Sequence, residues 1–353
     1  MGDLYIRGEN GLKGVCLTEN GTLTLREFPV PPVTEGMVKI RTRFAGVCST
    51  DVGYWKNGSE KLCLPVILGH EMSGVIEETA PDVTEFRVGD RVIVTNDYHL
   101  CGKCRFCRRG QINMCVERRS IGSAENGAMA EFMVVPARMV LHLPDTVSFE
   151  EGALAEVIAC GVHAMEQMAH AQPGQVVLVM GPGIMGITAA MAAQAMGCTV
   201  VLAGLSRDAG RLDFARQLRI PYVIDTEKED LPALLYKLTD GYGADIAAEC
   251  TGSYGGLETC FRLTAKCGTV VQIAIPHGRH ETDISPVIKK ELRYVGSYAK
   301  TMSDWMTTLR LMEEGKLDCR LLISEKLPLE RYEEAFTQTA EAKAFKILFD
   351  LNE

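Results

Sequence analysis

The chain lacks the marks of a nucleic-acid-binding or disordered protein. It has no block of basic residues, no low-complexity tract and no internal repeat, and its 37 Lys and Arg are outnumbered by 46 Asp and Glu, for a net charge of −9. A chain of this charge repels a phosphate backbone, so we expect no nucleic-acid partner. A hydrophobic fraction of 46% with 24% charged residues excludes collagen and coiled coil, and a length of 353 residues suggests two domains.

A targeting signal and a membrane span are also missing from the sequence pattern. The N-terminus has no basic stretch followed by an apolar segment. No Asp, Glu, Lys or Arg lies between Glu166 and Arg207, but two Gly-Pro turns divide this interval into pieces too short to cross a bilayer. The 13 cysteines are an odd number, which favours reduced thiols or metal ligands. We therefore expect a cytoplasmic protein without a membrane partner.

The pattern of strands and helices changes near residue 150. Before it, loops with Gly and Pro separate short strands, and an Asn20-Gly21 turn predicts a hairpin, so this part is predicted to be a compact β-barrel-like unit. After it, strands alternate with helices, which predicts a parallel sheet covered on both faces. The predicted strands are 14–17, 22–25, 38–44, 73–77, 91–94, 131–135, 176–180, 199–203, 222–224, 244–250, 269–274, 293–296 and 344–349, and the predicted helices include 184–196, 303–314 and 329–341.

A cluster of four cysteines is the strongest local signal. Their C-x2-C-x2-C-x7-C spacing, with glycines that let the loop curl, suits a closed tetrahedral zinc site that serves structure. Free thiols, a disulfide loop and an iron–sulfur centre are the alternatives, and the last differs from the ferredoxin spacing. Neighbouring Lys and Arg side chains would offset the charge of four thiolates, although they also resemble a nucleic-acid-binding ribbon. The four predicted ligands are Cys101, Cys104, Cys107 and Cys115.

A glycine-rich turn predicts a dinucleotide site. The segment Gly181-Pro182-Gly183-Ile184-Met185-Gly186 is a G-x-G-x-x-G motif that follows a predicted strand and opens a predicted helix. These glycines allow a tight turn and a close approach of the backbone, so that a pyrophosphate can lie at the helix N-terminus. A purely structural glycine turn is the alternative.

The end of the next predicted strand bears on the choice of cofactor. NAD-binding sites usually carry an acidic residue there, but this chain has Gly204. Ser206 and Arg207 suit a 2′-phosphate, because a guanidinium can pair with phosphate through two hydrogen bonds. We therefore favour NADP over NAD. Asp208 leaves two alternatives open: it could reach the ribose of NAD, or the segment could be a solvated helix start.

Four further residues could form a second metal site. Cys48, His70, Glu71 and Glu156 supply a thiol, an imidazole and two carboxylates. One residue of each kind could hold a catalytic zinc with three protein ligands and leave a position open for a substrate oxygen. Their spacing in the sequence does not bring them together, and at each position a buried core residue is the alternative.

These motifs, in their order, resemble those of the zinc-dependent medium-chain alcohol dehydrogenases. Segments 48–51, 69–71 and 127–132, the four cysteines and the glycine motif carry the resemblance over nearly the whole chain. Segments 52–55 and 152–156 are similar to those of the sorbitol and polyol dehydrogenase branch. The resemblance implies an α/β fold: a doubly wound Rossmann domain at 155–296, and a β-rich, GroES-like barrel domain formed by 1–154 and 297–353.

The resemblance also implies roles for single residues. Cys48, His70 and Glu156 would hold the catalytic zinc, with Glu71 able to reach the metal directly or in exchange with water, and Asp51 would orient His70. Thr50 would begin the proton relay. Tyr54 would wall the substrate pocket, with an ordinary core aromatic as the alternative. Three departures from the branch are Gly53 in place of a relay histidine, Val157 after the third ligand, and the missing acid at position 204; Cys160 could also compete as a ligand.

The implied activity is the interconversion of a secondary alcohol and its ketone by hydride transfer with NAD(P), with two zinc ions per chain. The substrate would be a polyol, a sugar alcohol or its phosphate, and the protein would be a homodimer or homotetramer. A threonine-dehydrogenase-like amino alcohol activity is the nearest alternative. A zinc-free quinone reductase would lack the metal ligands, and a non-catalytic zinc- or nucleotide-binding protein would retain the sites without turnover.

Overall fold

The chain folds into two compact units in a computed structural model that describes residues 11–276 and 278–352. One unit contains the described residues up to Glu156 together with those from Asp318 onward, and the other is Val157–Leu317. Residues 297–317 thus pack within the second unit. The functional boundaries that the resemblance implies, at 154/155 and 296/297, stay a prediction.

A hairpin opens the first unit. β1 (Gly11–Leu17) pairs antiparallel with β2 (Leu23–Pro29), and β4 (Val66–Ile67) pairs with the other edge of β1. Gly21 in the connecting turn has a φ of 78°, which a glycine adopts without strain. The Asn20-Gly21 turn therefore forms the predicted hairpin.

A seven-stranded sheet forms the larger part of the same unit. Its order is β10-β6-β5-β3-β18-β17, and β9 also pairs with β3. β18 lies antiparallel to β3, so the last strand of the chain joins the first strands of the sheet. The bounds are β3 (Met37–Gly46), β5 (Glu71–Thr79), β6 (Arg91–Val94), β9 (Phe132–Pro136), β10 (Val140–His142), β17 (Ile323–Leu327) and β18 (Lys346–Asp350).

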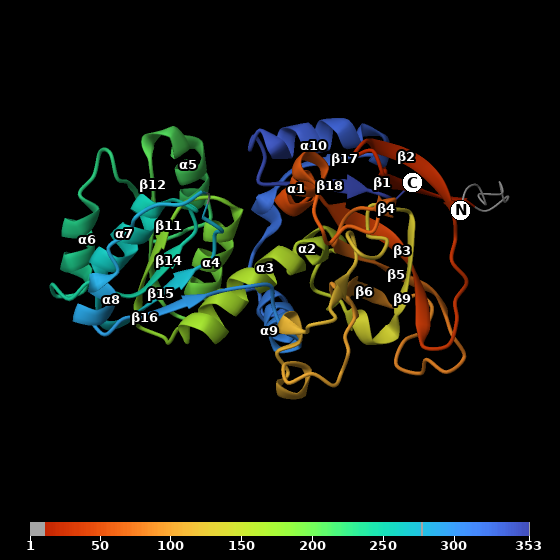
Figure 1. Cartoon of the computed structure of the whole chain (residues 1–353), viewed down its shortest axis with the longest axis horizontal. Coiled ribbons are helices and arrows are strands. Elements are labelled where there is room, and N and C mark those ends of the chain that lie inside the picture. The colour runs from red at the N-terminus through yellow and green to blue at the C-terminus, as the bar shows by residue number, and fades with distance from the viewer. Residues whose placement is uncertain (1–10, 277, 353) are drawn as a thin grey trace. The chain divides into compact units, whose positions relative to one another are not determined.

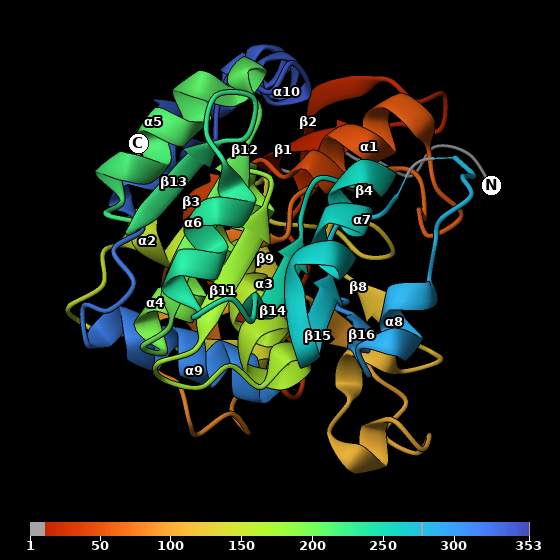
Figure 2. The ribbon, with the colours of Figure 1, turned by 90° about the vertical axis from the view of Figure 1, so that its left-hand side faces the viewer.

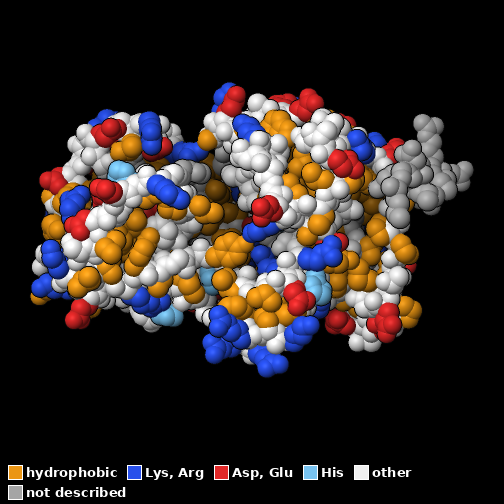
Figure 3. Space-filling view, viewed as in Figure 1, with side chains coloured by type: hydrophobic (Ala, Val, Ile, Leu, Met, Phe, Trp, Pro, Cys, Tyr) orange, Lys and Arg blue, Asp and Glu red, His pale blue; other side chains and the backbone are white. Residues whose placement is uncertain are grey.

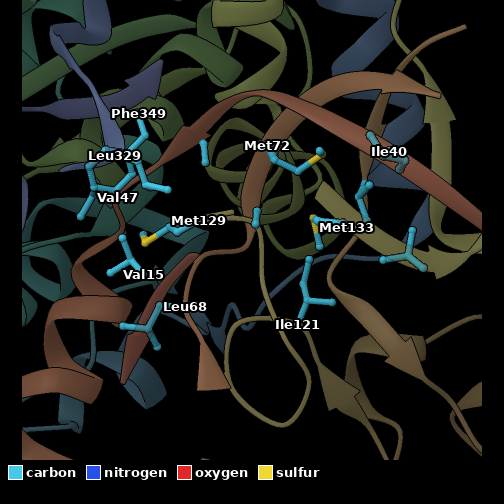
Figure 4. Close-up of a cluster of buried hydrophobic side chains, with 14 of the residues drawn as sticks. Val15, Ile40, Val47, Leu68, Met72, Ile121, Met129, Met133, Leu329 and Phe349 are labelled. Atoms are coloured by element: carbon cyan, nitrogen blue, oxygen red, sulfur yellow. The ribbon is translucent and has the colours of Figure 1, made fainter. Parts of the chain in front are cut away.

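The core of the first unit lies among these strands and the helices that cover them. Val47, Phe349 and Leu329 are buried in this core, and so are Ile40 and Met133, which lie opposite one another in the β3–β9 pairing (Figure 4). The helices are α1 (Ser49–Asn57), α2 (Phe149–Ala153) and α10 (Tyr332–Ala340); α3 (Ala155–Val162) begins at the end of the unit. A separate lobe lies between the two short paired strands β7 (Asp97–His99) and β8 (Arg119–Ser120), with 3-10 turns η1 (Cys107–Arg109) and η2 (Ile112–Met114).

The second unit is a parallel sheet with helices on both faces. The strand order is β13-β12-β11-β14-β15-β16, and every pairing is parallel. The strands lie between α4 and α5 on one face and α6, α7 and α8 on the other (Figures 1 and 2). The bounds are β11 (Val176–Met180), β12 (Thr199–Gly204), β13 (Tyr222–Asp225), β14 (Ala244–Glu249), β15 (Thr264–Gln272), β16 (Arg293–Gly296), α4 (Ile184–Ala195), α5 (Ala209–Gln217), α6 (Leu231–Leu238), α7 (Tyr254–Leu263) and α8 (Ser285–Lys289).

Two further elements complete this unit. The π-helix η4 (His163–Ala169) continues from α3, and α9 (Met302–Glu313) packs nearby, since His163 Nδ1 and Asp304 Oδ2 lie 2.8 Å apart. Every residue of β11 is buried, as expected for a central parallel strand with two covered faces. The predicted doubly wound α/β architecture is confirmed.

Candidate metal and nucleotide sites

The lobe of the first unit brings its four cysteines together. The sulfurs of Cys101, Cys104, Cys107 and Cys115 all lie within 4.8 Å of one another. The Sγ of Cys101 lies 3.6 Å from that of Cys115 and 4.0 Å from that of Cys107. Four thiolates around one zinc, at the usual zinc–sulfur distance, would be about 3.8 Å apart, so the arrangement fits this metal.

Backbone groups of the lobe also support thiolates. The N–H groups of Cys101, Cys104 and Cys107 each point at a sulfur of the cluster, at 3.4 to 3.5 Å. Such donors stabilise negative sulfur. Figure 3 shows Lys and Arg side chains gathered at the end of this lobe, and the four cations of the segment are exposed; they are Lys103, Arg105, Arg108 and Arg109. They make this lobe locally basic, as expected of a segment that carries four thiolates.

A second set of metal-ligating atoms forms where α1 begins. The Sγ of Cys48, a ring nitrogen of His70 and a carboxylate oxygen of Glu71 lie within 4.8 Å of one another. Cys48 is the N-cap of α1, and its Sγ accepts a hydrogen bond from the backbone N–H of Thr50 at 3.5 Å. A thiol at a helix N-terminus is readily deprotonated. Cys48 thus meets the adjacent residues His70 and Glu71, which lie on another segment of the chain.

Asp51 organises this second set. Its Oδ2 accepts the backbone N–H of Cys48 at 3.0 Å, and its Oδ1 lies 3.4 Å from Nδ1 of His70. Asp51 is fully buried. Burial alone would lower the pKa of His70, but the charges of Asp51 and Cys48 outweigh it and raise that pKa well above its usual value. A carboxylate that orients a ligating imidazole in this way is typical of zinc sites.

The thiol of Cys48 is activated by the same surroundings. Burial would raise its pKa, and so would Glu71, but the positive charges of Lys346 and His70 outweigh both and lower it. Lys346 is a buried lysine on β18 whose Nζ donates a hydrogen bond to Oε1 of Glu71. The other oxygen of Glu71, Oε2, is buried and has no hydrogen-bond partner among the described residues. A carboxylate with such an oxygen, close to a thiol and an imidazole, fits a nearby cation, so these residues suit a zinc ion.

The other residues predicted for this site, Glu156, Thr50 and Tyr54, are not part of the cluster. The carboxylate of Glu156 is not among the three clustered groups; its Oε1 accepts a hydrogen bond from Nδ2 of Asn96 at 2.7 Å, and Glu156 is 7% exposed. Thr50 is exposed at the start of α1. Tyr54 is half-buried and packs against the hydrophobic core of the unit, as its neighbour Trp55 does. The structure therefore unites Cys48, His70 and Glu71, and leaves Glu156 as a predicted third ligand.

The second unit contains a nucleotide-sized cavity of about 440 Å³ beside the glycine motif. Gly181, Gly183, Gly204 and Arg207 line it, whereas Ile184, Met185, Gly186 and Ser206 are not among its lining residues. Gly186 shapes the cavity without lining it, because a Cβ at this position would lie 1.9 Å from the carbonyl oxygen of Gly181. The turn can close only because position 186 has no side chain, as expected of the last glycine in such a motif.

The end of β12 shows why no acid occupies position 204. A Cβ at Gly204 would lie 2.9 Å from Cγ of Pro182, in the glycine motif itself. Ser206 does not point its hydroxyl hydrogen into the cavity; it donates to the carboxylate of Asp225, at 2.8 and 3.0 Å. Serine therefore fixes the loop that carries Arg207.

Arg211 is a residue of this cavity that we did not predict. It lines the cavity from α5, and its Nη1 lies 3.9 Å from the position that a Cβ on Gly183 would occupy. The sequence contains a partial signal, because Arg211 follows Arg207 by one helical turn and so shares its face. Two guanidinium groups, one exposed and one half-buried, thus border the glycine motif.

Comparisons with known proteins identify the family of this chain. Residues 34–145 match the family described as the alcohol dehydrogenase GroES-like domain, and residues 185–314 match the zinc-binding dehydrogenase family. The D-arabitol-phosphate dehydrogenase of Enterococcus avium is 32% identical over 97% of this chain and 98% of its own. The sorbitol dehydrogenase of Halalkalibacterium halodurans is 34% identical over 96% of this chain and 98% of its own. A solved structure from Sinorhizobium meliloti, described as a zinc-binding dehydrogenase with NADP bound, has a TM-score of 0.88 and 25% identity, and covers 97% of this chain and 100% of its own.

The chain belongs to the zinc-dependent medium-chain alcohol dehydrogenase superfamily. It is an NAD(P)-dependent oxidoreductase that acts on a small-molecule alcohol, and its similarity to the sorbitol and polyol branch is confirmed. Among residues 11–276 and 278–352, no helix has the length and apolar character needed to cross a membrane.

Proposed function

We propose that this enzyme oxidises a secondary hydroxyl of a polyol or polyol phosphate to the ketone, at a zinc ion held by Cys48, His70 and Glu156. The observation that carries the proposal is the meeting of the Cys48 thiol, the His70 imidazole and the Glu71 carboxylate at the start of α1. Glu156 is the third ligand that the resemblance implies. The zinc would supply Lewis acidity that makes the substrate hydroxyl more acidic, while the nicotinamide would take the hydride.

The chain's own residues would prepare this chemistry. Asp51 holds His70 in one orientation through the 3.4 Å contact and supports the Cys48 backbone. Thr50, exposed at the helix start, would take the hydroxyl proton of the substrate at Oγ1. Gly53 has no side chain to continue the relay, so exposed Thr50 would pass its own hydroxyl proton to water. Tyr54 would form one wall of the substrate pocket.

A second zinc would stabilise the lobe of the first unit. The sulfur–sulfur distances of 3.6 and 4.0 Å support four thiolate ligands, and the closed set leaves no position for a substrate. The proposed stoichiometry is therefore two zinc ions per chain.

For the cofactor we propose NADP in preference to NAD. Position 204 has no room for the acid that binds the ribose of NAD, and Arg207 offers a guanidinium at the same cavity. A relative solved with NADP shares the fold at 25% identity. Arg211, beside Gly183, would contact the pyrophosphate that both cofactors contain. The backbone of the glycine motif would hold the same group.

The substrate class follows from the relatives. One acts, by its name, on a polyol phosphate and the other on sorbitol, and both match nearly the full chain. The proposed substrate is therefore either a free polyol or a polyol phosphate, and the same hydroxyl chemistry applies to both.

We also propose that the enzyme is a homodimer or homotetramer. β16 is the edge strand of the parallel sheet, so the backbone groups on its outer side have no partner strand among the described residues. Tyr294 on this strand and Ile288 and Ile284 before it are 43%, 76% and 61% exposed. A second copy of the chain could pair with this edge and cover these side chains. None of the thirteen cysteines, all of which lie among the described residues, forms a disulfide, and this suits a reducing compartment such as the cytoplasm.

The decisive experiment is to follow the absorbance of reduced nicotinamide over polyols, polyol phosphates, amino alcohols and simple secondary alcohols, with NAD and NADP separately. The proposal predicts turnover of a polyol or its phosphate, faster with NADP at equal concentration. Turnover confined to amino alcohols would replace it with a threonine-dehydrogenase-like activity. No turnover with any substrate and either cofactor, in protein that holds two zinc ions, would favour a non-catalytic role.

A further inference from the structure

The buried pair of Lys346 and Glu71 is a feature that the proposed function does not use. Their side chains are only 3% and 0% exposed. Lys346 lies on β18 near the end of the chain, whereas Glu71 opens β5, so the pair joins segments that are 275 residues apart. A fully buried lysine is rare unless it is paired, because removing a charge from water is costly. The burial of Lys346 is therefore explained only if its positive charge compensates a buried negative one.

The negative charge that Lys346 compensates is the carboxylate of Glu71. Lys346 Nζ donates a hydrogen bond to Oε1, whereas Oε2 is buried and finds no hydrogen-bond partner in the part of the chain that the structure describes. Gly46 lies opposite Glu71 in the β3–β5 pairing, and a Cβ on it would lie 2.2 Å from Oε2. The carboxylate of Glu71 fits against β3 only because position 46 has no side chain. Among the described residues, no donor fixes Oε2.

The same carboxylate lies close enough to become a ligand. One of its oxygens is within 4.8 Å of both the Cys48 sulfur and a His70 ring nitrogen. With Cys48, His70 and Glu156 as ligands, the thiolate and one carboxylate already balance the two charges of zinc. A second carboxylate would add a negative charge and fill the fourth position of a tetrahedral site.

We propose that Lys346 is a positioning residue that holds Glu71 outside the ligand set and so reserves one metal position for substrate. The proposal rests on the function proposed above, because it takes Cys48, His70 and Glu156 as the ligands. Lys346 neutralises Glu71 and attracts it through Oε1. Without this ammonium group the carboxylate would be buried and uncompensated, and the zinc ion would be the cation nearest to it.

The test compares zinc retention in wild-type protein and three variants: Lys346→Met, Lys346→Arg and the double variant Lys346→Met with Glu71→Gln. Each is titrated with a chelator, and each is also loaded with cobalt, whose absorption reports the number and kind of ligands. All variants keep the four cysteines of the lobe, so differences between them report the Cys48 site.

The proposal predicts that Lys346→Met retains its catalytic-site zinc at least about tenfold more tightly than wild type, because it gains a carboxylate ligand. Its cobalt spectrum should shift, and its turnover should fall because the position for substrate is filled. Lys346→Arg keeps the charge and should behave as wild type. The double variant should lose the tenfold gain, since an amide cannot replace the anionic ligand.

Unchanged or weaker zinc retention in Lys346→Met, with an unchanged cobalt spectrum, would overturn the proposal and leave Lys346 a structural cation. If Lys346→Met does not fold, Glu71→Gln alone still decides: the proposal predicts zinc retention within about threefold of wild type, and a tenfold loss would show that Glu71 is already a ligand. A wild-type protein with metal only in the four-cysteine lobe would overturn the proposed function as well. Zinc at both sites with no response to Lys346→Met would reject the Lys346 role alone.

Discussion

The two arginines of the nucleotide cavity should contribute differently to cofactor binding. Arg207 is exposed on the loop after β12, whereas Arg211 is half-buried and its Nη1 lies 3.9 Å from the Cβ position of Gly183. The first would meet only the 2′-phosphate of NADP, and the second would meet the pyrophosphate of both cofactors. Replacing each by alanine therefore separates the two contacts.

The size of each effect follows from exposure. Water and salt screen an exposed ion pair, so Arg207→Ala should cost about 1 kcal/mol and raise the Michaelis constant for NADP about fivefold. A charge-assisted hydrogen bond that is partly shielded contributes about 1.5 to 3 kcal/mol, so Arg211→Ala should raise both Michaelis constants at least about tenfold. The Michaelis constant for NAD should change by less than about twofold in Arg207→Ala.

The assay is initial-rate kinetics with the best polyol substrate and varied cofactor, supported by titration of each oxidised cofactor into the protein. Lys228→Ala is a matched control, since Lys228 is an exposed cation of the neighbouring loop that pairs with Asp225 and does not line the cavity. Equal effects of Arg207→Ala on NAD and NADP would refute the phosphate contact. If Arg211→Ala raised the Michaelis constant for NADP alone, Arg211 would contact the 2′-phosphate and not the pyrophosphate.

Three further changes test the two metal sites and the nucleotide site. Cys107→Ser should remove one of two zinc ions and lower the melting temperature, whereas Cys267→Ser, an exposed thiol outside both metal clusters, should change neither; metal analysis and calorimetry measure this. Glu156→Gln should reduce turnover more than about 100-fold while nucleotide affinity stays unchanged in a titration, and retained turnover would exclude Glu156 as a ligand. Gly186→Ala should weaken nucleotide binding at least about tenfold because its Cβ would meet the Gly181 carbonyl, whereas Gly210→Ala, with open space around it, should bind normally.

The parallel sheet was predictable because its signals are local. The bounds predicted for β11 and β16 match the structure residue for residue, and α4 ends one residue before its predicted end. Continuous apolar runs between Gly-rich turns mark buried parallel strands, and the helix of small residues after Gly183 packs on the sheet at close range. The four-cysteine lobe was predictable for a similar reason, since all four ligands fall within one loop.

The elements that build the second metal site have weaker signals. α1 was not predicted: only Asp51 and Val52 are buried along it, so it has no apolar stripe, and its cap is a cysteine, which is not a usual N-cap residue. Lys346 was also missed, because it lies in an apolar strand that is distant in sequence from Glu71. Contacts of this kind depend on the pairing of β18 with β3, which a strand pattern alone does not specify.

The most direct test of the central claim is the metal dependence of turnover with the best substrate. The enzyme is treated with a chelator until the Cys48 site is empty by metal analysis, and zinc is then restored, with polyol oxidation followed at each stage. The account predicts that turnover is lost as this zinc leaves and returns when one equivalent is added back, while nucleotide binding persists throughout. Turnover that continues after the site has lost its metal would contradict it.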